Sequence, residues 1–397
     1  MRKHKDFIFR LLTLLLFSCS SAVMGQMLED PLDRFPEPQA NFQQHIKEVR
    51  AYLLDTQLER RQPGDVEYNV PFELSASAKV PFRGKYLLIH GLNDSPAVWR
   101  DVAASLAQRG FDVRAILLPG HGNTPEAQLN VSYLQWLDAA RTQLEYWRSP
   151  DMPIYLGGFS LGGVLATILA LESDGIDGLF LFAPAYNSSR VGLLRWASLV
   201  SYFKPWVFGG MIIEDNPTKY NSIPINAAAQ YYKAAKYLQN LWNEKQNRKR
   251  LTMPVLIVET LDDSVVNVDT TRKIFATRFS SPKRRLVLYG NEETEPGEYE
   301  IVRSSRYPEH RILNQSHMGM MLSPQNSLFG ALGTQLVCNG NEWKVFSACL
   351  YYSGGTRWRG AEGAESPDGV PVARTTYNPD FDAVMALHDQ VFATELQ

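Results

Sequence analysis

The sequence predicts an α/β fold in which a mostly parallel central sheet is flanked by helices. Short apolar runs recur along the chain, and such runs are typical of strands buried on both faces of a parallel sheet. Helix-sized intervals separate the runs, and this repeated strand–helix–strand order favours parallel pairing. A Gly-x-Ser-x-Gly segment also joins one run to the helix after it, as a sharp strand-to-helix turn does.

The predicted elements follow one another in a regular order. The strands are the apolar runs 86–89, 113–118, 154–156, 179–182, 255–258 and 286–289. The helices are the intervals 97–108, 132–148, 160–172 and 269–279. A short amphipathic helix is expected before them, because apolar residues recur at helical spacing from Phe42 to Leu53. Asn378 and Pro379 stand in the preferred order to open a last helix.

Three segments interrupt the core, which we expect in two parts, 61–185 and 251–397. Residues 186–250 are rich in large apolar side chains and are interpreted as a cap or lid over a pocket. A helical packing layer without a substrate role is the alternative, since most apolar residues are simply core. Residues 291–310 form a polar excursion for which an edge hairpin is one interpretation, and 327–377 form a second excursion.

Residues 1–25 are interpreted as a secretory signal peptide, because a basic start precedes an apolar run too short to span a bilayer. Residues 16–19 resemble a bacterial lipobox, in which Cys19 would be lipidated and would hold the protein on a membrane. Cleavage after Gly25 is the alternative. Residues 26–60 then provide a polar tether and the leading helix. We expect an exported protein that is periplasmic, anchored to the envelope membrane by lipid, or secreted.

The composition argues against a nucleic-acid partner, because 40 Lys and Arg against 42 Asp and Glu give a formal net charge of −2 without a long basic run. The sequence lacks a His-Glu-x-x-His motif and clustered Cys and His, so no metal or cofactor is implied. Export permits Cys338 and Cys349 to form a disulfide, and two buried free thiols are the alternative. Nothing in the sequence indicates the oligomeric state.

Ser160 is the candidate nucleophile. It is the centre of Gly158-Phe159-Ser160-Leu161-Gly162, which follows one apolar run and opens a helix. A serine on such a turn has a strained backbone, so the residues two positions away must be small. The turn lifts the hydroxyl above the sheet, where the helix N-terminus supplies backbone N–H groups. A serine alone is a weak nucleophile and needs a base and an orienting acid.

Both partners are found downstream, in loops that follow strands. Asp262 or Asp263 is the acid, and Asp263 is preferred because it directly precedes Ser-Val-Val. Three histidines follow, of which His388 lies inside the final helix and is expected to be structural. His317 is preferred over His310 as the base, because it stands just past a predicted short strand.

Two backbone N–H groups are candidates for binding the developing oxyanion. That of Leu161 follows the nucleophile directly, and that of Leu92 lies in the loop after the first predicted strand. Gly91 lets this loop approach the nucleophile closely. His90 is expected to hold the loop by hydrogen bonds.

Five segments together resemble the α/β-hydrolase superfamily: HGLNDSP at 90–96, LPGHG at 118–122, GFSLGG at 158–163, TLDDSVV at 260–266 and QSHMG at 315–319. Within it the chain looks most like the branch of monoacylglycerol lipases, bacterial carboxylesterases and serine-aminopeptidase-like proteins. The resemblance covers about residues 80–325 and the final helix.

The resemblance implies roles for particular residues. It implies Ser160 as nucleophile, Asp263 as acid, His317 as base, and Leu92 and Leu161 as oxyanion donors. It also implies an α/β-hydrolase fold with a helical cap inserted after the sixth strand, matching residues 186–250. The acid-to-base interval is longer than is usual for this branch, because of the excursion at 291–310.

We therefore expect an exported serine hydrolase that cleaves a carboxylic ester through an acyl-enzyme. The aromatic cap favours a small-molecule ester or lipid, such as a monoacylglycerol or a lysophospholipid. A serine peptidase or amidase with the same triad is one alternative. A non-catalytic envelope protein that keeps the fold for binding is the other.

Overall fold

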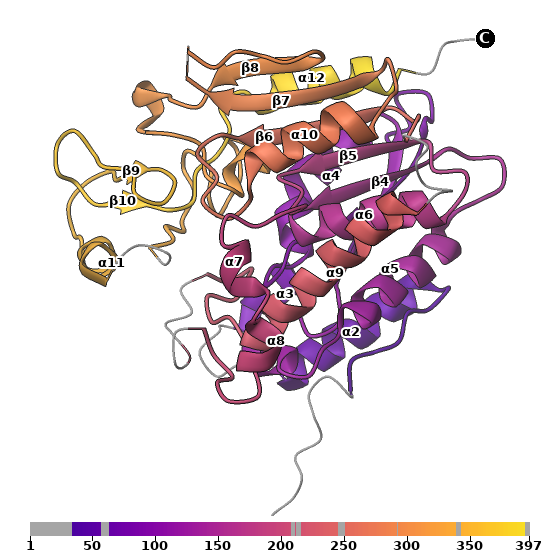
Figure 1. Ribbon diagram of the computed structural model, residues 1–397, viewed down its shortest axis with the longest axis horizontal. Helices are drawn as coiled ribbons and strands as arrows, with labels where there is room; N and C mark the ends of the chain where they lie inside the picture. The colour runs from indigo at the N-terminus through magenta and orange to yellow at the C-terminus, as the bar shows by residue number, and fades with distance from the viewer. Residues whose placement is uncertain are drawn as a thin grey trace, which may run out of the picture.

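The computed structural model describes residues 34–56, 63–207, 211, 216–244, 251–291, 293–338 and 343–393. The predicted signal peptide, Cys19 and the first part of the tether lie outside these residues. The described chain forms an eight-stranded sheet in the order β1-β3-β2-β4-β5-β6-β7-β8 (Figure 1). The strands are β1 (Phe72–Leu74), β2 (Gly84–Ile89), β3 (Phe111–Ile116), β4 (Ile154–Phe159), β5 (Gly178–Phe182), β6 (Val255–Thr260), β7 (Arg284–Gly290) and β8 (Glu300–Ser304). Only β1 pairs antiparallel within this sheet, so the predicted mostly parallel sheet is confirmed.

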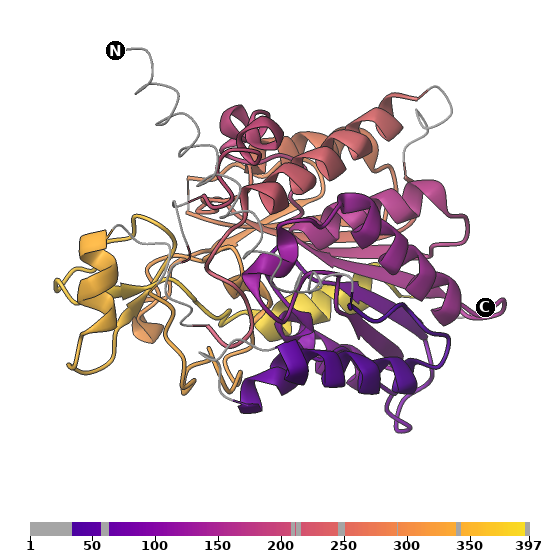
Figure 2. The ribbon, with the colours of Figure 1, turned by 90° about the horizontal axis from the view of Figure 1, so that it is seen from below.

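Helices cover both faces of the sheet, as Figures 1 and 2 show. Residues alternate between faces along a strand, so Leu87 and Ile89 of β2 enter one core and Tyr86 and Leu88 enter the other. The first core is closed by α2 (Phe42–Thr56), α5 (Tyr133–Trp147), α6 (Leu161–Glu172), α9 (Ile225–Asn243) and α10 (Val268–Arg278). The second is closed by α4 (Arg100–Gln108) and α12 (Phe381–Val391). The three layers form the predicted α/β-hydrolase arrangement.

The remaining elements are short and lie in loops. The α-helices are α3 (Val66–Asn69), α7 (Val191–Leu194), α8 (Ala197–Val200) and α11 (Trp343–Leu350), and β9 (Trp358–Arg359) and β10 (Val372–Ala373) form a two-stranded sheet. Single 3₁₀ turns occupy Pro63–Asp65, Pro96–Trp99, Pro125–Gln128, Pro308–His310 and Gly319–Met321. In the described residues no helix is both long and apolar enough to cross a bilayer.

The predicted cap is the insertion between β5 and β6, and its two parts differ. Helix α9 packs on α5 and α6, where its side chains from Tyr231 to Trp242 join the first core, whereas Ile225 and Ala229 pack on Ala197 of α8. Helices α7 and α8 instead expose large apolar side chains such as Trp196 and Leu199. Among the described residues, five strands precede the insertion, whereas we expected six, so the predicted place of the cap is wrong by one strand. The difference arises because a single strand, β1, comes before the parallel strands.

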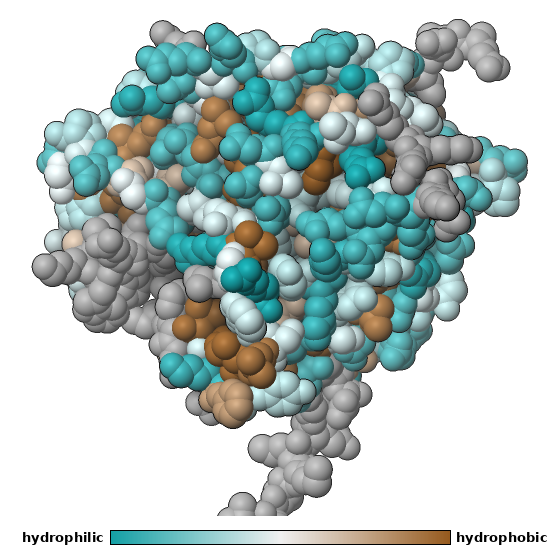
Figure 3. All heavy atoms as spheres, in the orientation of Figure 1, coloured by the Kyte–Doolittle hydropathy of each residue, from teal (hydrophilic) through white to brown (hydrophobic). Residues whose placement is uncertain are grey.

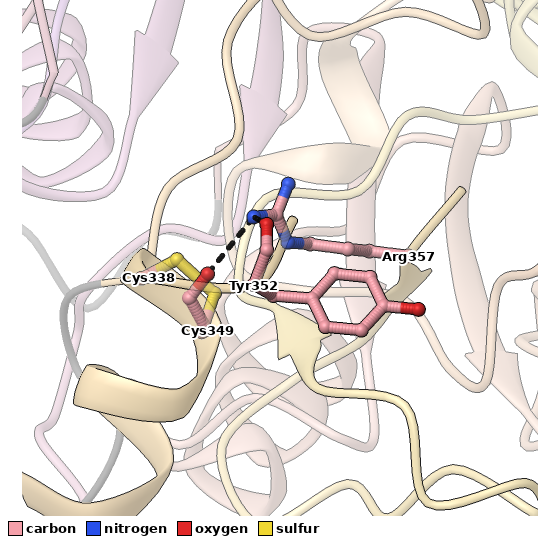
Figure 4. Close-up of a disulfide and its surroundings, with 4 residues drawn as sticks. All are labelled: Cys338, Cys349, Tyr352 and Arg357. Carbon is pink, nitrogen blue, oxygen red and sulfur yellow. Dashed lines mark hydrogen bonds between the residues drawn. A yellow bond between two sulfur atoms is a disulfide. The ribbon is translucent and has the colours of Figure 1, made fainter. Parts of the chain in front are cut away.

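The two excursions have different structures. Residues 291–310 contain β8, which pairs parallel to β7, so the interpretation as an edge hairpin is wrong because hairpin strands are antiparallel. Residues 327–377 contain α11, β9 and β10 and project from one side of the molecule in both ribbon views. Cys338 and Cys349 are joined by a disulfide in this lobe, and their Cα atoms lie 5.7 Å apart. Figure 4 shows Arg357 donating to the carbonyl oxygens of Cys349 and Tyr352 beside it.

Candidate active site

Ser160 lies on a sharp turn between β4 and α6. Its φ of 54° and ψ of −115° are a conformation that non-glycine residues rarely adopt, and such strain costs about 1–3 kcal/mol. The turn needs small neighbours: a Cβ on Gly158 would lie 2.5 Å from the carbonyl oxygen of Gly162, and one on Gly162 would lie 2.0 Å from that of Ile89. The Ser160 N–H donates to the Phe182 carbonyl at 3.0 Å. The turn is therefore held by contacts with β2 and β5.

The loop after β2 lies directly against this turn. A Cβ on Gly91 would lie 3.2 Å from the Cβ of Ser160, so any larger residue would crowd the serine. The buried His90 ring donates from Nδ1 to the Gly91 carbonyl at 2.8 Å and accepts from the Leu118 N–H at 3.0 Å. Burial lowers the pKa of His90 well below its usual value, consistent with this neutral tautomer. His90 thus holds the loop that carries Leu92, as expected.

Leu161 is the first residue of α6, so its N–H has no acceptor within the helix. It follows Ser160 directly, while Leu92 follows the glycine that contacts Ser160. Both predicted donors therefore lie beside the serine, one at the positive end of a helix and one in the opposing loop. The two N–H groups therefore stay the candidates for binding an oxyanion.

His317 and Asp263 form a hydrogen-bonded pair, 54 residues apart in the chain. The His317 Nδ1 donates to Asp263 Oδ2 at 2.5 Å, and the Asp263 side chain is fully buried. The other carboxylate oxygen accepts the N–H groups of Val265 at 2.7 Å and Val266 at 2.9 Å. Burial by itself would raise the pKa of Asp263, but His317 and the two N–H groups outweigh burial and lower it. Asp263 is therefore a carboxylate that orients the imidazole.

The imidazole also contacts the nucleophile turn, since the His317 ring centroid lies 4.9 Å from that of Phe159. The loop that carries His317 is braced by the end of the second excursion. The Ser316 N–H donates to the Thr376 hydroxyl at 3.1 Å, and the Gln315 amide donates to the Tyr377 carbonyl at 3.1 Å. Residues from four distant parts of the sequence thus meet at the carboxyl ends of β2, β4 and β6.

The other candidates for the acid and the base of the site lie elsewhere or have other hydrogen-bond partners. The N–H of the half-buried Asp262 donates to the Thr260 hydroxyl at 3.3 Å, and it is the neighbouring carboxylate that pairs with His317. His310 lies in an exposed 3₁₀ turn, with 43% of its side chain accessible. His388 is buried in α12, with Nε2 2.8 Å from the Tyr86 hydroxyl, and burial lowers its pKa to about 4. These positions suit structural roles.

The sequence reasoning missed two buried carboxyl groups at this end of the sheet. Asp94 is 3% exposed, and burial raises its pKa to about 6 although Lys219 and His317 act in the opposite direction. Glu259 is fully buried near the end of β6. Glu259 could have been found, because an acidic residue ending an otherwise apolar strand is an unusual buried polar group. Asp94 lies within the HGLNDSP segment at 90–96, but its surroundings depend on the cap, which supplies Lys219.

A cap segment lies over the loop after β2. The Tyr220 N–H donates to the Asn93 carbonyl at 2.8 Å, and the Asn69 amide donates to the Pro217 carbonyl at 2.8 Å. Residues 216–222 are therefore tied to the site, whereas α7 and α8 are more exposed. Across the described residues, no three His, Cys, Asp or Glu side chains gather as a metal site would require.

Comparison with known proteins finds hydrolases. A family model described as serine aminopeptidase, S33, matches residues 81–222, which include Leu92 and Ser160 and end before Asp263. The chain is 28% identical over 207 residues to a thermostable monoacylglycerol lipase of Bacillus sp. (strain H-257), covering 52% of this chain and 80% of the relative. It is 26% identical over 196 residues to a carboxylesterase of Bacillus subtilis (strain 168), covering 48% and 76%.

Among solved structures, a chain from a study of the metagenome-derived lipolytic enzymes LipS and LipT is 20% identical to this chain, with a TM-score of 0.47. The match covers 56% of this chain and 87% of that chain.

Proposed function

Because the chain is a member of the α/β-hydrolase superfamily and its relatives are of the lipase and esterase type, we propose that it is an exported serine hydrolase that cleaves carboxylic esters through an acyl-enzyme on Ser160. The observation that carries the proposal is the Asp263–His317 pair, whose imidazole packs beside the strained Ser160 turn. Nucleophile, base and orienting acid are the three groups that this chemistry requires.

In the proposed reaction, the free Nε2 of His317 takes the Ser160 hydroxyl proton as the oxygen attacks the ester carbonyl. The N–H groups of Leu92 and Leu161 stabilise the oxyanion, and each such donor contributes about 2–4 kcal/mol to the transition state. The imidazolium then gives its proton to the leaving alcohol, and Asp263 stabilises its charge meanwhile. Water attacks the acyl-enzyme by the same steps and releases the acid.

We propose an apolar acyl group, such as that of a monoacylglycerol or a lysophospholipid. Two features support this choice. One curated relative is itself a monoacylglycerol lipase. The cap also exposes an apolar area over α7, α8 and the turn after them, and the brown spheres near α8 in Figure 3 lie in this area. Its members are Val191, Trp196, Leu199, Val200, Tyr202, Phe203 and Val207, which we call the cap patch. Such patches mark surfaces that meet apolar partners.

Ser160→Ala tests the proposal. We expect hydrolysis of a short p-nitrophenyl ester to fall at least about 10⁴-fold with the fold intact, because the acyl-enzyme cannot form. A fluorophosphonate probe should label wild-type protein and not the variant. Ser173→Ala, at the other end of α6, is the matched control and should keep both properties.

Three results would contradict the proposal. Full turnover by the Ser160→Ala variant would exclude this nucleophile. Folded wild-type protein that the probe leaves unlabelled would favour a binding protein. Faster cleavage of aminoacyl p-nitroanilides than of esters would favour the peptidase that the family description names.

The export proposal rests on residues 1–25 and is tested by the N-terminus of protein made in an exporting bacterial host. A lipidated Cys19 or a start at Gln26 would support export, whereas a protein that keeps Met1 would contradict it.

A further inference from the structure

Glu259 is a fully buried acidic residue on the strand that leads to the acid of the site. It lies on β6, four residues before Asp263, between Val258 and Thr260 and opposite Leu288 of β7. An unpaired carboxylate in such surroundings is costly, because water no longer solvates its charge. A glutamic acid at this position therefore needs a partner or a proton.

The groups that face Glu259 are not cationic. Its Oε1 accepts the Thr260 N–H at 3.2 Å, and its other oxygen is buried without an N–H or O–H donor. Its carboxyl group interacts with the Asp263 carboxyl, which raises the pKa of Glu259, whereas the Thr271 hydroxyl of α10 lowers that pKa and is the smallest of the influences on it. Tyr186, after β5, also faces it, but that hydroxyl is bonded to the Thr167 hydroxyl at 2.9 Å. Glu259 thus meets a second carboxyl group and no ammonium or guanidinium group among the described residues.

Two adjacent buried carboxyl groups cannot both be ionised without strong repulsion, so they share one proton. The donors decide which group keeps it. Asp263 receives three hydrogen bonds, from His317 and from the N–H groups of Val265 and Val266. Glu259 receives a single N–H bond. Burial, together with the negative charge of Asp263, accordingly raises the pKa of Glu259 well above its usual value.

We propose that Glu259 is a positioning residue of the active site, whose protonated carboxyl group donates a hydrogen bond to Asp263 and holds that carboxylate toward His317. The donated bond is charge-assisted, and such bonds are short and strong. Because Glu259 keeps its proton, the buried Glu259–Asp263 pair carries one negative charge. The imidazolium of His317 formed during acyl transfer then faces a single carboxylate. The kinetic consequence rests on the proposed hydrolase function, whereas the protonation state does not.

The protonation state can be measured in the wild-type protein without any assay of activity. With ¹³C-labelled glutamate side chains, one carboxyl resonance should remain at the protonated position at pH 7, where exposed carboxyl groups are ionised. Its absence from the spectrum of the Glu259→Gln variant assigns it. If every glutamate carboxyl is ionised at pH 7, the inference is wrong, whatever the enzyme hydrolyses.

Two variants test the positioning role. Glu259→Gln keeps a neutral donor of the same shape, so the acidic limb of the pH–rate profile should stay in place and kcat should stay within about threefold of wild type. Glu259→Leu removes the donor, so kcat should fall about tenfold with little change in KM. The matched control is Asp262→Asn, which neutralises the neighbouring, half-buried carboxylate and should leave the limb unchanged.

Other outcomes would overturn the inference. If Glu259 were ionised, Glu259→Gln would remove a negative charge near the imidazolium and move the acidic limb to lower pH. If Glu259→Leu folds and keeps wild-type kcat, the donated bond has no role in positioning. If neither variant folds, the ¹³C measurement still decides the protonation state. A wild-type protein that shows the protonated resonance but no hydrolysis would instead contradict the proposed function.

Discussion

Three buried carboxyl groups at the carboxyl ends of β2 and β6 differ in the donors they meet. Asp263 receives three hydrogen bonds and is a carboxylate, whereas Glu259 receives one N–H bond, has the Thr271 hydroxyl beside it, and is proposed to hold a proton. Asp94 lies between these cases: its Oδ1 accepts the Ser95 N–H at 2.9 Å, and its side chain is influenced by Lys219 and His317. Hydrogen bonds and nearby charges, together with burial, therefore set the charge of each group.

The buried Asp94 carboxyl group should destabilise the folded protein at neutral pH. Burial raises its pKa from 3.8 to about 6, so the folded protein binds this proton more tightly than the unfolded chain does. Stability therefore falls as pH rises from about 4 to about 6 and stays low above that range. We expect Asp94→Asn to raise the free energy of unfolding at pH 8 by about 2–3 kcal/mol and to have little effect at pH 4.

Urea unfolding of both proteins at pH 4 and pH 8 measures this difference. If the difference in free energy of unfolding between the Asp94→Asn variant and wild type is the same at pH 4 and pH 8, Lys219 already compensates the buried charge. A stabilised variant with reduced ester hydrolysis would indicate that the costly carboxylate is kept for the site, since active sites commonly reduce stability.

The local motifs made the positions of Ser160, Leu92 and Asp263 at a sharp turn or a strand end predictable, because such features are encoded by adjacent residues, while their catalytic roles stay predictions. The charges of Asp94 and Glu259 could not be predicted in this way. Asp94 depends on a group far away in the sequence, Lys219, and Glu259 depends on its burial and on how the loop after β6 turns Asp263 back toward it. Sequence spacing shows that a residue ends a strand but not which donors it meets there.

At the scale of elements, the large apolar side chains of residues 186–250 indicated an insertion between two strands but not its division into two parts. Helix α9 buries one face on α6, while α7 and α8 are four residues each and expose their apolar side chains. Both segments carry large apolar side chains, so tertiary contacts decide which of them become a packing layer and which an exposed surface. The excursion at 291–310 likewise became an edge strand because its backbone could extend the open edge beside β7.

The disulfide lobe is the element whose stability should depend on a covalent link. Its chain leads through Arg374 and Thr376 to the loop that holds His317. In the chain-entropy account, closing a loop of this size stabilises by about 3 kcal/mol. We expect Cys338→Ser with Cys349→Ser to lower the melting temperature and to increase proteolysis within 327–377.

Because the β-sheet core does not contain the disulfide, the double variant should still be labelled at Ser160 by a fluorophosphonate. Limited proteolysis of wild-type protein with and without a reductant is the control and should reproduce the change. Equal protection of the lobe in the variant and in wild type would mean that contacts such as Arg357 with the Cys349 carbonyl hold it without the link.

At the scale of the whole molecule, the cap patch and the disulfide lobe lie around one end of the sheet. The Arg190 side chain, at the start of the cap, pairs with Glu362 of the lobe at 3.3 Å. The Ser189 N–H donates to the Val265 carbonyl at 3.1 Å, which ties the cap to the loop of Asp263. Cap, lobe and acid loop are therefore joined by direct contacts, and we propose that the cap patch meets an apolar substrate.

The cap patch should matter for aggregated lipid and not for soluble esters. Tyr202 and Phe203 are 86% and 83% exposed, so replacing both by serine removes little packing from the folded protein. Each aromatic side chain would bury apolar area against a lipid aggregate, at roughly 25 cal/mol per Å². We expect the double variant to lose about tenfold in kcat/KM on dispersed long-chain monoacylglycerol and to keep its activity on a short p-nitrophenyl ester.

Leu332→Ser with Tyr351→Ser is the matched control, because these two side chains are 97% and 80% exposed but lie in the disulfide lobe. It should leave both activities unchanged. Equal losses on both substrates in the cap variant would point to a general effect on the site through the segment 216–222. Unchanged hydrolysis of the dispersed lipid would remove the cap patch as support for a lipid substrate and favour a short, soluble ester, because such a substrate needs no apolar surface outside the pocket.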